Sequence, residues 1–433
     1  MPDPKSDDPI DLSVFSEIGR LRHVIVHSPG AEVDVMPPSM MEDLLFDDIL
    51  YGERARLEHS RFRSVMESLD VEVHDFQDLL TDALSHAAGA SQELLADLQG
   101  LEGLRSVVTE QLGALAPERL AEALVHGLPN PDHHQDSESP FLLPPLPNLL
   151  FSRDPQIVLG NGVVISSMKK GARRREPLLS RFLFRHAPRL QESTVLADLL
   201  GLSQRKAWSG DSPTLEGGDV IVLKEGVVLA GVSERTSEHG VDQLADTLRK
   251  TGKFKTLIMV PMPHLRSAMH LDTIFTRLSE DECLAYAPLI SGESSDALRP
   301  ISIDLNREDW GRRHPSLLAA LADAGVHMKA IPCGGGTSLV QQAREQWTDG
   351  ANCFAIRSGF VFMYSRNTAT AEELTKNGYH VVSTSEMEFD EDGNCQYSFS
   401  PDKKYVVLIA GEELSRARGG PRCMTMPLQR DGF

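Results

Sequence analysis

The sequence predicts an α/β fold in which a unit of two strands, a helix and another strand is repeated around a closed ring, with a mainly helical subdomain inserted. Three observations predict it. An acidic residue followed by two short apolar runs with a Gly-bearing turn between them recurs along the chain, helical segments separate the copies, and one Leu-rich stretch follows three- and four-residue steps.

The composition is that of a folded chain whose partner is small. Of the 433 residues, 41% are hydrophobic and 24% charged, which is ordinary for a globular protein with a well-defined core. The formal net charge of −20 argues against nucleic acid or an anionic membrane as a partner, because both attract clustered Lys and Arg.

Targeting and cysteine signals predict a cytoplasmic protein. No apolar run approaches the roughly 20 residues that cross a bilayer, and the N-terminus lacks the basic and then apolar order of a signal peptide. The five cysteines are odd in number, widely spaced and form no CxxC pair, so neither a disulfide framework nor a zinc site is expected. The sequence is compatible with a homo-oligomer as well as with a monomer.

The first elements along the chain are a buried strand and a helical segment. Residues 22–27, RHVIVH, form an apolar run typical of a strand. From about Leu79 to Leu128 the apolar residues recur at helical spacing. We therefore expect residues 1–78 to begin the main domain, 79–143 to form an inserted, mainly helical subdomain, and 144–433 to complete the main domain.

The hairpin pattern follows in four copies. In the first two, Asp154 precedes a hairpin that turns at residues 160–162, and Glu216 with Asp219 precedes one that turns at residues 224–226. Weaker copies begin at Asp272 and Asp349. In a ring, equivalent strand ends gather about one axis, so these carboxylates would meet in a central pocket. The alternative is coincidence, because an acid before a hairpin is common in turns.

Four segments contain most of the candidate functional residues: PNLLFSRD at 147–154, LEGGD at 215–219, MHLDT at 269–273 and RGGPRCM at 418–424. Together, and in this order, they resemble arginine deiminases, which belong to the pentein or guanidino-group-modifying superfamily. The resemblance extends from LRHVIVHSPG at 21–30 through REQWTDGAN at 344–352 to the C-terminal cysteine segment. It implies a five-bladed pseudosymmetric α/β propeller and hydrolysis of free L-arginine to L-citrulline and ammonia.

Cys423 is the expected nucleophile. It follows a Gly-Gly-Pro loop and lies at the edge of an element, where a nucleophile is accessible. A free cysteine is more often a small buried hydrophobic residue, and only the surrounding motifs overturn that interpretation. Positive charge from the substrate guanidinium, with His270 as a second candidate source, would favour the thiolate, and a covalent S-alkylthiouronium intermediate would follow.

His270 is expected to act as general acid and base, because it titrates near neutral pH. His270 and Asp272 are two residues apart in a segment that looks like a strand, so both side chains should face one side. The resemblance makes Glu216 the residue that orients the imidazole. The two glycines after Glu216 permit a close approach of the backbone beside the site.

Complementary charges are expected around the substrate. A guanidinium presents a fork of N–H donors that carboxylates accept in pairs, and by resemblance Asp154 and Asp272 fill this role. An amino-acid carboxylate calls for arginine, and the motif positions give Arg173, Arg235 and Arg418. Asn148, Phe151 and Asp219 also match substrate-binding positions of the family. No metal and no cofactor is implied.

Three positions depart from the family pattern. Ser152 stands where threonine is frequent, Thr348 where asparagine is frequent, and Ala417 where glycine is common before the arginine. Two alternatives follow from the same motifs. One is another pentein reaction, such as amidino transfer or hydrolysis of a modified arginine. The other is a noncatalytic binding protein on this fold, against which the retained Cys, His and acidic residues count.

Overall fold

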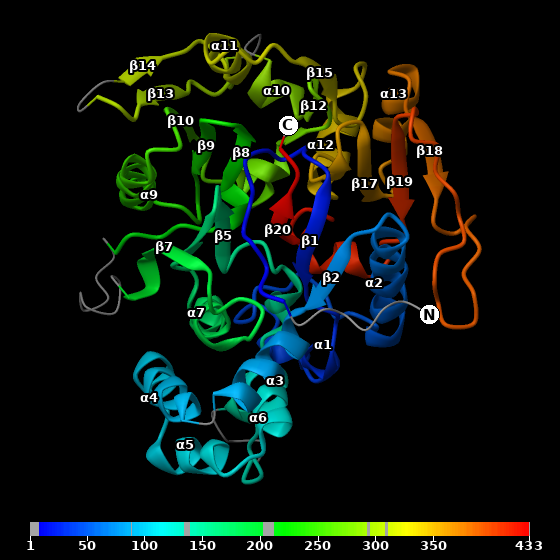
Figure 1. The fold of residues 1–433 in the computed structure, drawn as a ribbon. Coiled ribbons are helices and arrows are strands. Elements are labelled where there is room, and N and C mark those ends of the chain that lie inside the picture. The colour runs from blue at the N-terminus through cyan, green and yellow to red at the C-terminus, as the bar shows by residue number, and fades with distance from the viewer. Residues whose placement is uncertain are drawn as a thin grey trace.

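The computed structural model of the protein describes residues 8–87, 89–133, 139–201, 212–291, 295–307 and 311–432. Within these ranges, helices and strands alternate along most of the chain, which gives a mixed α/β architecture (Figure 1). None of the helices in the described ranges is both long enough and apolar enough to span a lipid bilayer.

One strand arrangement recurs in separate open sheets. A hairpin of two antiparallel strands is followed by a helix, and the next strand pairs in parallel with the second hairpin strand. The first copy contains β5 (Gln156–Leu159), β6 (Gly162–Ile165), α7 (Arg175–His186) and β7 (Thr194–Asp198). The second contains β8 (Val220–Lys224), β9 (Val227–Val232), α9 (Glu238–Thr251) and β10 (Thr256–Pro261).

Two later copies carry additions. The third contains β11 (Phe275–Arg277), β12 (Glu282–Ala285), α10 (Ala287–Ile290), α11 (Leu317–Asp323) and β15 (Lys329–Pro332). Its insert, β13 (Ile301–Asp304) with β14 (Gly311–Arg313), extends the preceding sheet beside β10. The fourth contains α12 (Leu339–Trp347), β16 (Phe354–Arg357), β17 (Phe360–Tyr364), α13 (Thr368–Lys376), β18 (His380–Ser383) and β19 (Tyr405–Ile409).

The two ends of the chain build one more copy. Strand β20 (Met426–Arg430) pairs antiparallel with β1 (Leu21–Val26), which pairs in parallel with β2 (Glu72–Asp75). Helices α1 (Ala31–Asp34) and α2 (Gly52–Glu67) lie between these two N-terminal strands in sequence. Figure 1 shows the red β20 beside the blue β1 near the middle of the molecule.

The four predicted hairpins are confirmed as β5–β6, β8–β9, β11–β12 and β16–β17. Glycines make the first two turns, because Gly160 and Gly226 have φ values of 59° and 80°, a left-handed conformation that suits glycine. The strands of these two hairpins are buried almost throughout, with only Lys224 and Val232 partly exposed.

Four helices form a separate cluster at one end of the molecule (Figure 1). They are α3 (Phe76–His86), α4 (Ala90–Glu102), α5 (Ser106–Gly113) and α6 (Pro117–His126), followed by the short hairpin of β3 (Leu128–Pro129) and β4 (Phe141–Leu143). The periodic leucines Leu94, Leu95 and Leu98 are buried in a hydrophobic core that these helices share with α7 and with strands of the first two copies. Gly103, in the left-handed conformation with φ 66°, ends α4.

One local prediction is wrong. Residues 271–273 form a 3₁₀ turn rather than a strand, and only His270 keeps an extended backbone. The Leu271 amide donates to Asp219 Oδ1 at 2.9 Å, and Thr273 Oγ1 donates to the carbonyl of His270 at 2.6 Å. These bonds take the place of a strand ladder.

Candidate active site

Turns at the ends of the strands bring the predicted residues to one place. The described part of the chain has a pocket whose lining includes Cys423, His270, Asp154, Arg173, Arg235, Arg418, Asn148 and Phe151. These side chains come from different copies of the repeated unit and from the C-terminal turn before β20. The rest of the lining is Leu45, Arg266, Met269, Thr273, Asp349, Ala417 and Gly419.

The backbone of Cys423 is held on both sides. Asn352 Oδ1 accepts hydrogen bonds from the backbone amides of Arg422 and Cys423, at 3.1 and 3.2 Å. The Arg153 amide donates to the carbonyl of Cys423 at 3.0 Å. The thiol lies 3.9 Å from Asp272 Oδ2. The sulfur is therefore positioned by contacts that do not depend on its own side chain.

His270 and Glu216 form a buried pair. His270 Nε2 lies 2.9 Å from Glu216 Oε2, and His270 Nδ1 lies 3.9 Å from Asp154 Oδ1. Burial lowers the pKa of His270, but the charge of Asp154 and the bond to Glu216 outweigh it and raise the pKa to about 9. The imidazole is thus cationic at neutral pH.

Glu216 stays ionised although it is buried. Burial raises its pKa, but the charge of Arg235 and the bond to His270 outweigh this and lower it. Its second oxygen, Oε1, accepts from the Lys169 amide at 3.0 Å. The Glu216 carboxylate is therefore held by two contacts, and it holds the imidazole ring of His270 in place.

Asp154 and Asp272 are each paired with an arginine. Arg173 Nη1 lies 2.7 Å from Asp154 Oδ2, and Arg422 Nη1 lies 2.7 Å from Asp272 Oδ2. Burial raises the pKa of Asp154, but His270 and Arg173 outweigh it and lower the pKa to about 2. Asp272 Oδ1 is buried without a hydrogen-bond partner among the described residues, and buried polar atoms of this kind point to an absent ligand or water.

The Cys423 thiol is protonated in this structure. Burial raises its pKa well above the usual value, and the charges of Asp272, Asp154 and Asp349 raise it further. The carboxylates therefore outweigh any positive charge that would favour the thiolate in this structure.

The three predicted arginines differ in what they contact. Arg173 is fully engaged, with Asp154 on one side and Glu176 on the other. Arg235 lies 3.6 Å from Glu216, and its Nε has no partner in the described ranges. Arg418 stacks over Trp347, at 3.5 Å from the ring centroid, and its Nε and Nη1 also lack partners there.

The three remaining predicted residues lie close by. Asn148 Nδ2 donates to the Leu44 carbonyl at 2.6 Å, and the Phe151 ring packs against Gly419. Like Glu216 and Asp272, Asp219 is not part of the pocket lining. It lies behind the site, where its carboxylate accepts from the Leu271 amide and from Ser233 Oγ, and burial raises its pKa to about 7.

Asp349 and Asn352 are two of the site residues that sequence reasoning missed. Asp349 was predicted only as the start of a hairpin, yet it lines the pocket, and burial raises its pKa to about 7. The signal was available, because Asp349 heads its hairpin as Asp154 heads another. Asn352, which holds Cys423, carried no such signal, since its role depends on a contact between distant segments.

Asp154, Glu216 and His270 could in principle hold a metal ion, because one donor atom from each lies within 4.8 Å of the others. Arg173 and Arg235 already compensate the two carboxylates. The two carboxylates therefore suit a protonated His270 as well as they would suit a metal ion.

Comparison with solved structures gives the class of the fold. An amidinotransferase of saxitoxin biosynthesis from Microseira wollei superposes with a TM-score of 0.50 at 13% identity, covering 98% of each chain. The N-terminal domain of ArgZ, a cyanobacterial arginine dihydrolase, gives 0.50 at 14% identity over 94% of this chain and 97% of that one. The protein has the pentein fold of these neighbours, with a buried Cys–His–carboxylate pocket.

Sequence comparison narrows the class to one family. The sequence model described as "Arginine deiminase" matches residues 42–430. An arginine deiminase of Listeria monocytogenes serotype 4a is 34% identical over 98% of both chains. One of Borrelia garinii subsp. bavariensis is 32% identical over 97% of this chain and 98% of its own. The chain belongs to the arginine deiminase family.

Proposed function

We propose that the protein hydrolyses free L-arginine to L-citrulline and ammonia. The observation that carries this proposal is the set of unpaired polar atoms around the pocket: Nε of Arg235, Nε and Nη1 of Arg418, Oδ1 of Asp272 and Oδ2 of Asp349 among the described residues. Cationic donors and anionic acceptors are both unsatisfied, and arginine offers a carboxylate to the first and a guanidinium to the second.

Binding uses the charges at the two ends of the substrate. Arg235 and Arg418 hold the carboxylate, and Asp154 and Asp272 accept the guanidinium N–H groups. Arg173 has to exchange partners before it can join them, because Asp154 and Glu176 occupy it in this structure. Asn148 and Phe151 contact the main chain and the side-chain stem of the substrate.

Chemistry starts when the guanidinium enters. Its charge offsets Asp154 and Asp272, which lowers the thiol pKa, so the Cys423 thiol releases its proton to solvent. The resulting thiolate attacks the guanidinium carbon to form a tetrahedral adduct. Protonated His270 gives its proton to the departing ammonia, which leaves an S-alkylthiouronium on Cys423. Neutral His270 then takes a proton from water, which attacks the same carbon and releases citrulline and the thiol. Glu216 steadies the imidazolium throughout.

The larger architecture supports the same proposal. We infer that the five separate sheets with the repeated strand order are blades of a pseudosymmetric propeller that surrounds the pocket. We also propose that residues 79–143 form the inserted helical subdomain between 1–78 and 144–433. A cytoplasmic setting is supported by the five cysteines, which are all free thiols.

Product analysis tests the function. Purified protein is incubated with arginine, an N-methylated arginine and agmatine, and amino acids and ammonia are quantified. We expect equal amounts of citrulline and ammonia from arginine and little turnover of agmatine, which lacks the carboxylate. Ornithine as the product, or an inert arginine with a reactive methylated analogue, would redirect the assignment to another reaction on guanidino compounds.

A further inference from the structure

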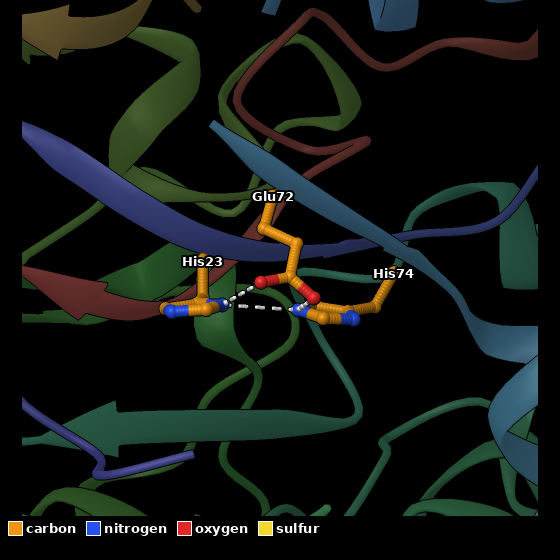
Figure 2. Close-up of side chains that lie close together, drawn as sticks. All are labelled: His23, Glu72 and His74. Atoms are coloured by element: carbon orange, nitrogen blue, oxygen red, sulfur yellow. Dashed lines mark hydrogen bonds and ion pairs between the residues drawn. The ribbon is translucent and has the colours of Figure 1, made fainter. Parts of the chain in front are cut away.

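A second group of donor atoms lies on the sheet formed by the chain ends. His23 is on β1, and Glu72 and His74 are on β2. The two strands are parallel, with His23 beside Glu72 in the register, and side chains two residues apart in a strand face the same side. All three side chains therefore project from one face, as Figure 2 shows.

The three side chains converge on one point. His23 Nδ1 lies 3.2 Å from His74 Nε2 and 3.4 Å from Glu72 Oε2, and His74 Nε2 lies 3.9 Å from Glu72 Oε1 (Figure 2). In a tetrahedral zinc site with bonds of about 2.05 Å, neighbouring donor atoms are about 3.3 Å apart. The two separations that involve His23 Nδ1 match this spacing, and the separation between His74 Nε2 and the Glu72 carboxylate is longer.

The surroundings suit an ion that keeps a water ligand. The side chains of His23 and Glu72 are 20% and 30% exposed, and both line a surface pocket. Arg189 Nη1 contacts Glu72 Oε1, which orients the carboxylate with Oε2 beside His23. A partner of this kind on a ligand's second oxygen is typical of metal sites. Two imidazoles and one carboxylate favour zinc over magnesium or calcium, which prefer oxygen donors alone.

We propose that His23, Glu72 and His74 bind a zinc ion, with water completing its coordination. The ion would connect β1 to β2 and so strengthen the sheet that joins the two ends of the chain. The cluster shares no residue with the catalytic pocket, so the proposal is independent of the proposed function. Without metal, the same atoms would be held by one imidazole N–H donating to the other ring.

The test is zinc titration of the full chain after chelator treatment, by calorimetry and by thermal unfolding. Wild type should bind a zinc equivalent and gain thermal stability with it, because an ion that binds only the folded state shifts the unfolding equilibrium. His23→Ala and Glu72→Gln should lower the affinity by about 10-fold or more and remove the gain. Glu72→Gln keeps the size of the side chain, and circular dichroism checks the fold of both variants.

Two controls locate the ion. His239→Ala removes an exposed histidine on α9 and should bind zinc as wild type does. Cys423→Ala removes the catalytic thiol and should also keep the zinc equivalent. Absence of zinc binding by wild type, unchanged binding by His23→Ala and Glu72→Gln, or loss of the equivalent in Cys423→Ala would each overturn the proposal.

Discussion

Cys423 lies beside three carboxylates, those of Asp272, Asp154 and Asp349, which together with burial keep its thiol protonated. The pKa of His270 is raised to about 9, and in the proposed mechanism this imidazolium protonates the departing ammonia. Under the proposed function, the substrate guanidinium would supply a cation between these carboxylates. Activation of the Cys423 thiol would then depend on substrate binding.

Replacing Cys423 with alanine should abolish turnover and retain arginine binding. The turn that holds the residue uses the backbone bonds to Asn352 and Arg153, which the substitution leaves in place. We expect the rate to fall by about 10⁴-fold or more, as for loss of other nucleophiles, while calorimetry still detects arginine. A variant that is folded but binds no arginine would contradict the assigned geometry.

Glu216→Gln should move the alkaline limb of the pH profile of kcat/KM to lower pH. The active form has protonated His270, so activity falls as pH rises through its pKa of about 9. Removing the Glu216 charge removes one cause of that raised pKa, and we expect kcat to fall by about 10²-fold or more. Glu282→Gln is the matched control, because Glu282 is also buried and bonded but contacts Tyr379 and Lys404. An unshifted limb in Glu216→Gln would show that Glu216 does not govern the imidazole.

At the scale of elements, the turns between strands position the candidate active-site side chains. The 3₁₀ turn at Gly217–Asp219 places two glycines where side chains would collide: a Cβ on Gly217 would lie 2.0 Å from the Arg153 carbonyl, and one on Gly218 would lie 2.6 Å from His270 Nδ1. Glycine is required at these positions by close approach rather than by backbone angle.

Gly218→Ala should therefore displace the His270 ring. Misplacing a catalytic group by about 1 Å costs roughly 10²-fold in rate, so we expect kcat to fall by about that factor with a smaller change in KM. Gly100→Ala is the control, since a Cβ there meets nothing within 4 Å and the residue lies inside α4. That control should keep its activity and gain up to about 1 kcal/mol of stability. Equal kinetics in both variants would refute the contact.

The hairpins could be predicted from sequence because alternating apolar runs and turn glycines are local signals. The conformation of residues 271–273 could not, since the bond from Leu271 to Asp219 joins two turns that are distant in sequence. The same holds for Asn352, whose contact with Cys423 is a long-range bond. The motif order identified the side chains that line the pocket, and long-range contacts decide how they are held there.

At the scale of the whole molecule, the chain ends meet in one sheet. β20 completes the sheet of β1 and β2, a pairing that periodicity cannot reveal because the strands lie at opposite ends of the sequence. Arg422 reinforces this closure. Its guanidinium bonds Glu17 from the N-terminal segment, Asp272 from the third copy and the Val220 carbonyl from the second.

Glu17→Gln should destabilise the whole fold. Burial raises the pKa of Glu17, but the charges of Arg422 and Arg153 outweigh it and lower the pKa from 4.5 to about 2. A lowered folded-state pKa contributes stability that is present above about pH 4.5 and is lost as pH falls through about 2. The shift corresponds to about 3 kcal/mol at neutral pH.

Urea unfolding of wild type and Glu17→Gln from pH 8 to pH 3 measures this contribution. The difference in unfolding free energy should stay near 3 kcal/mol down to about pH 4.5. It should then shrink, because the unfolded wild-type chain takes up a proton at Glu17 below that pH while the folded chain does so only near pH 2. Glu67→Gln breaks an exposed pair with Arg63 and should cost less than about 0.5 kcal/mol at any pH. A Glu17→Gln chain as stable as wild type at pH 7 would mean that Arg422 is sufficiently compensated by Asp272 alone, and that the ends of the chain are joined by strand pairing rather than by charge.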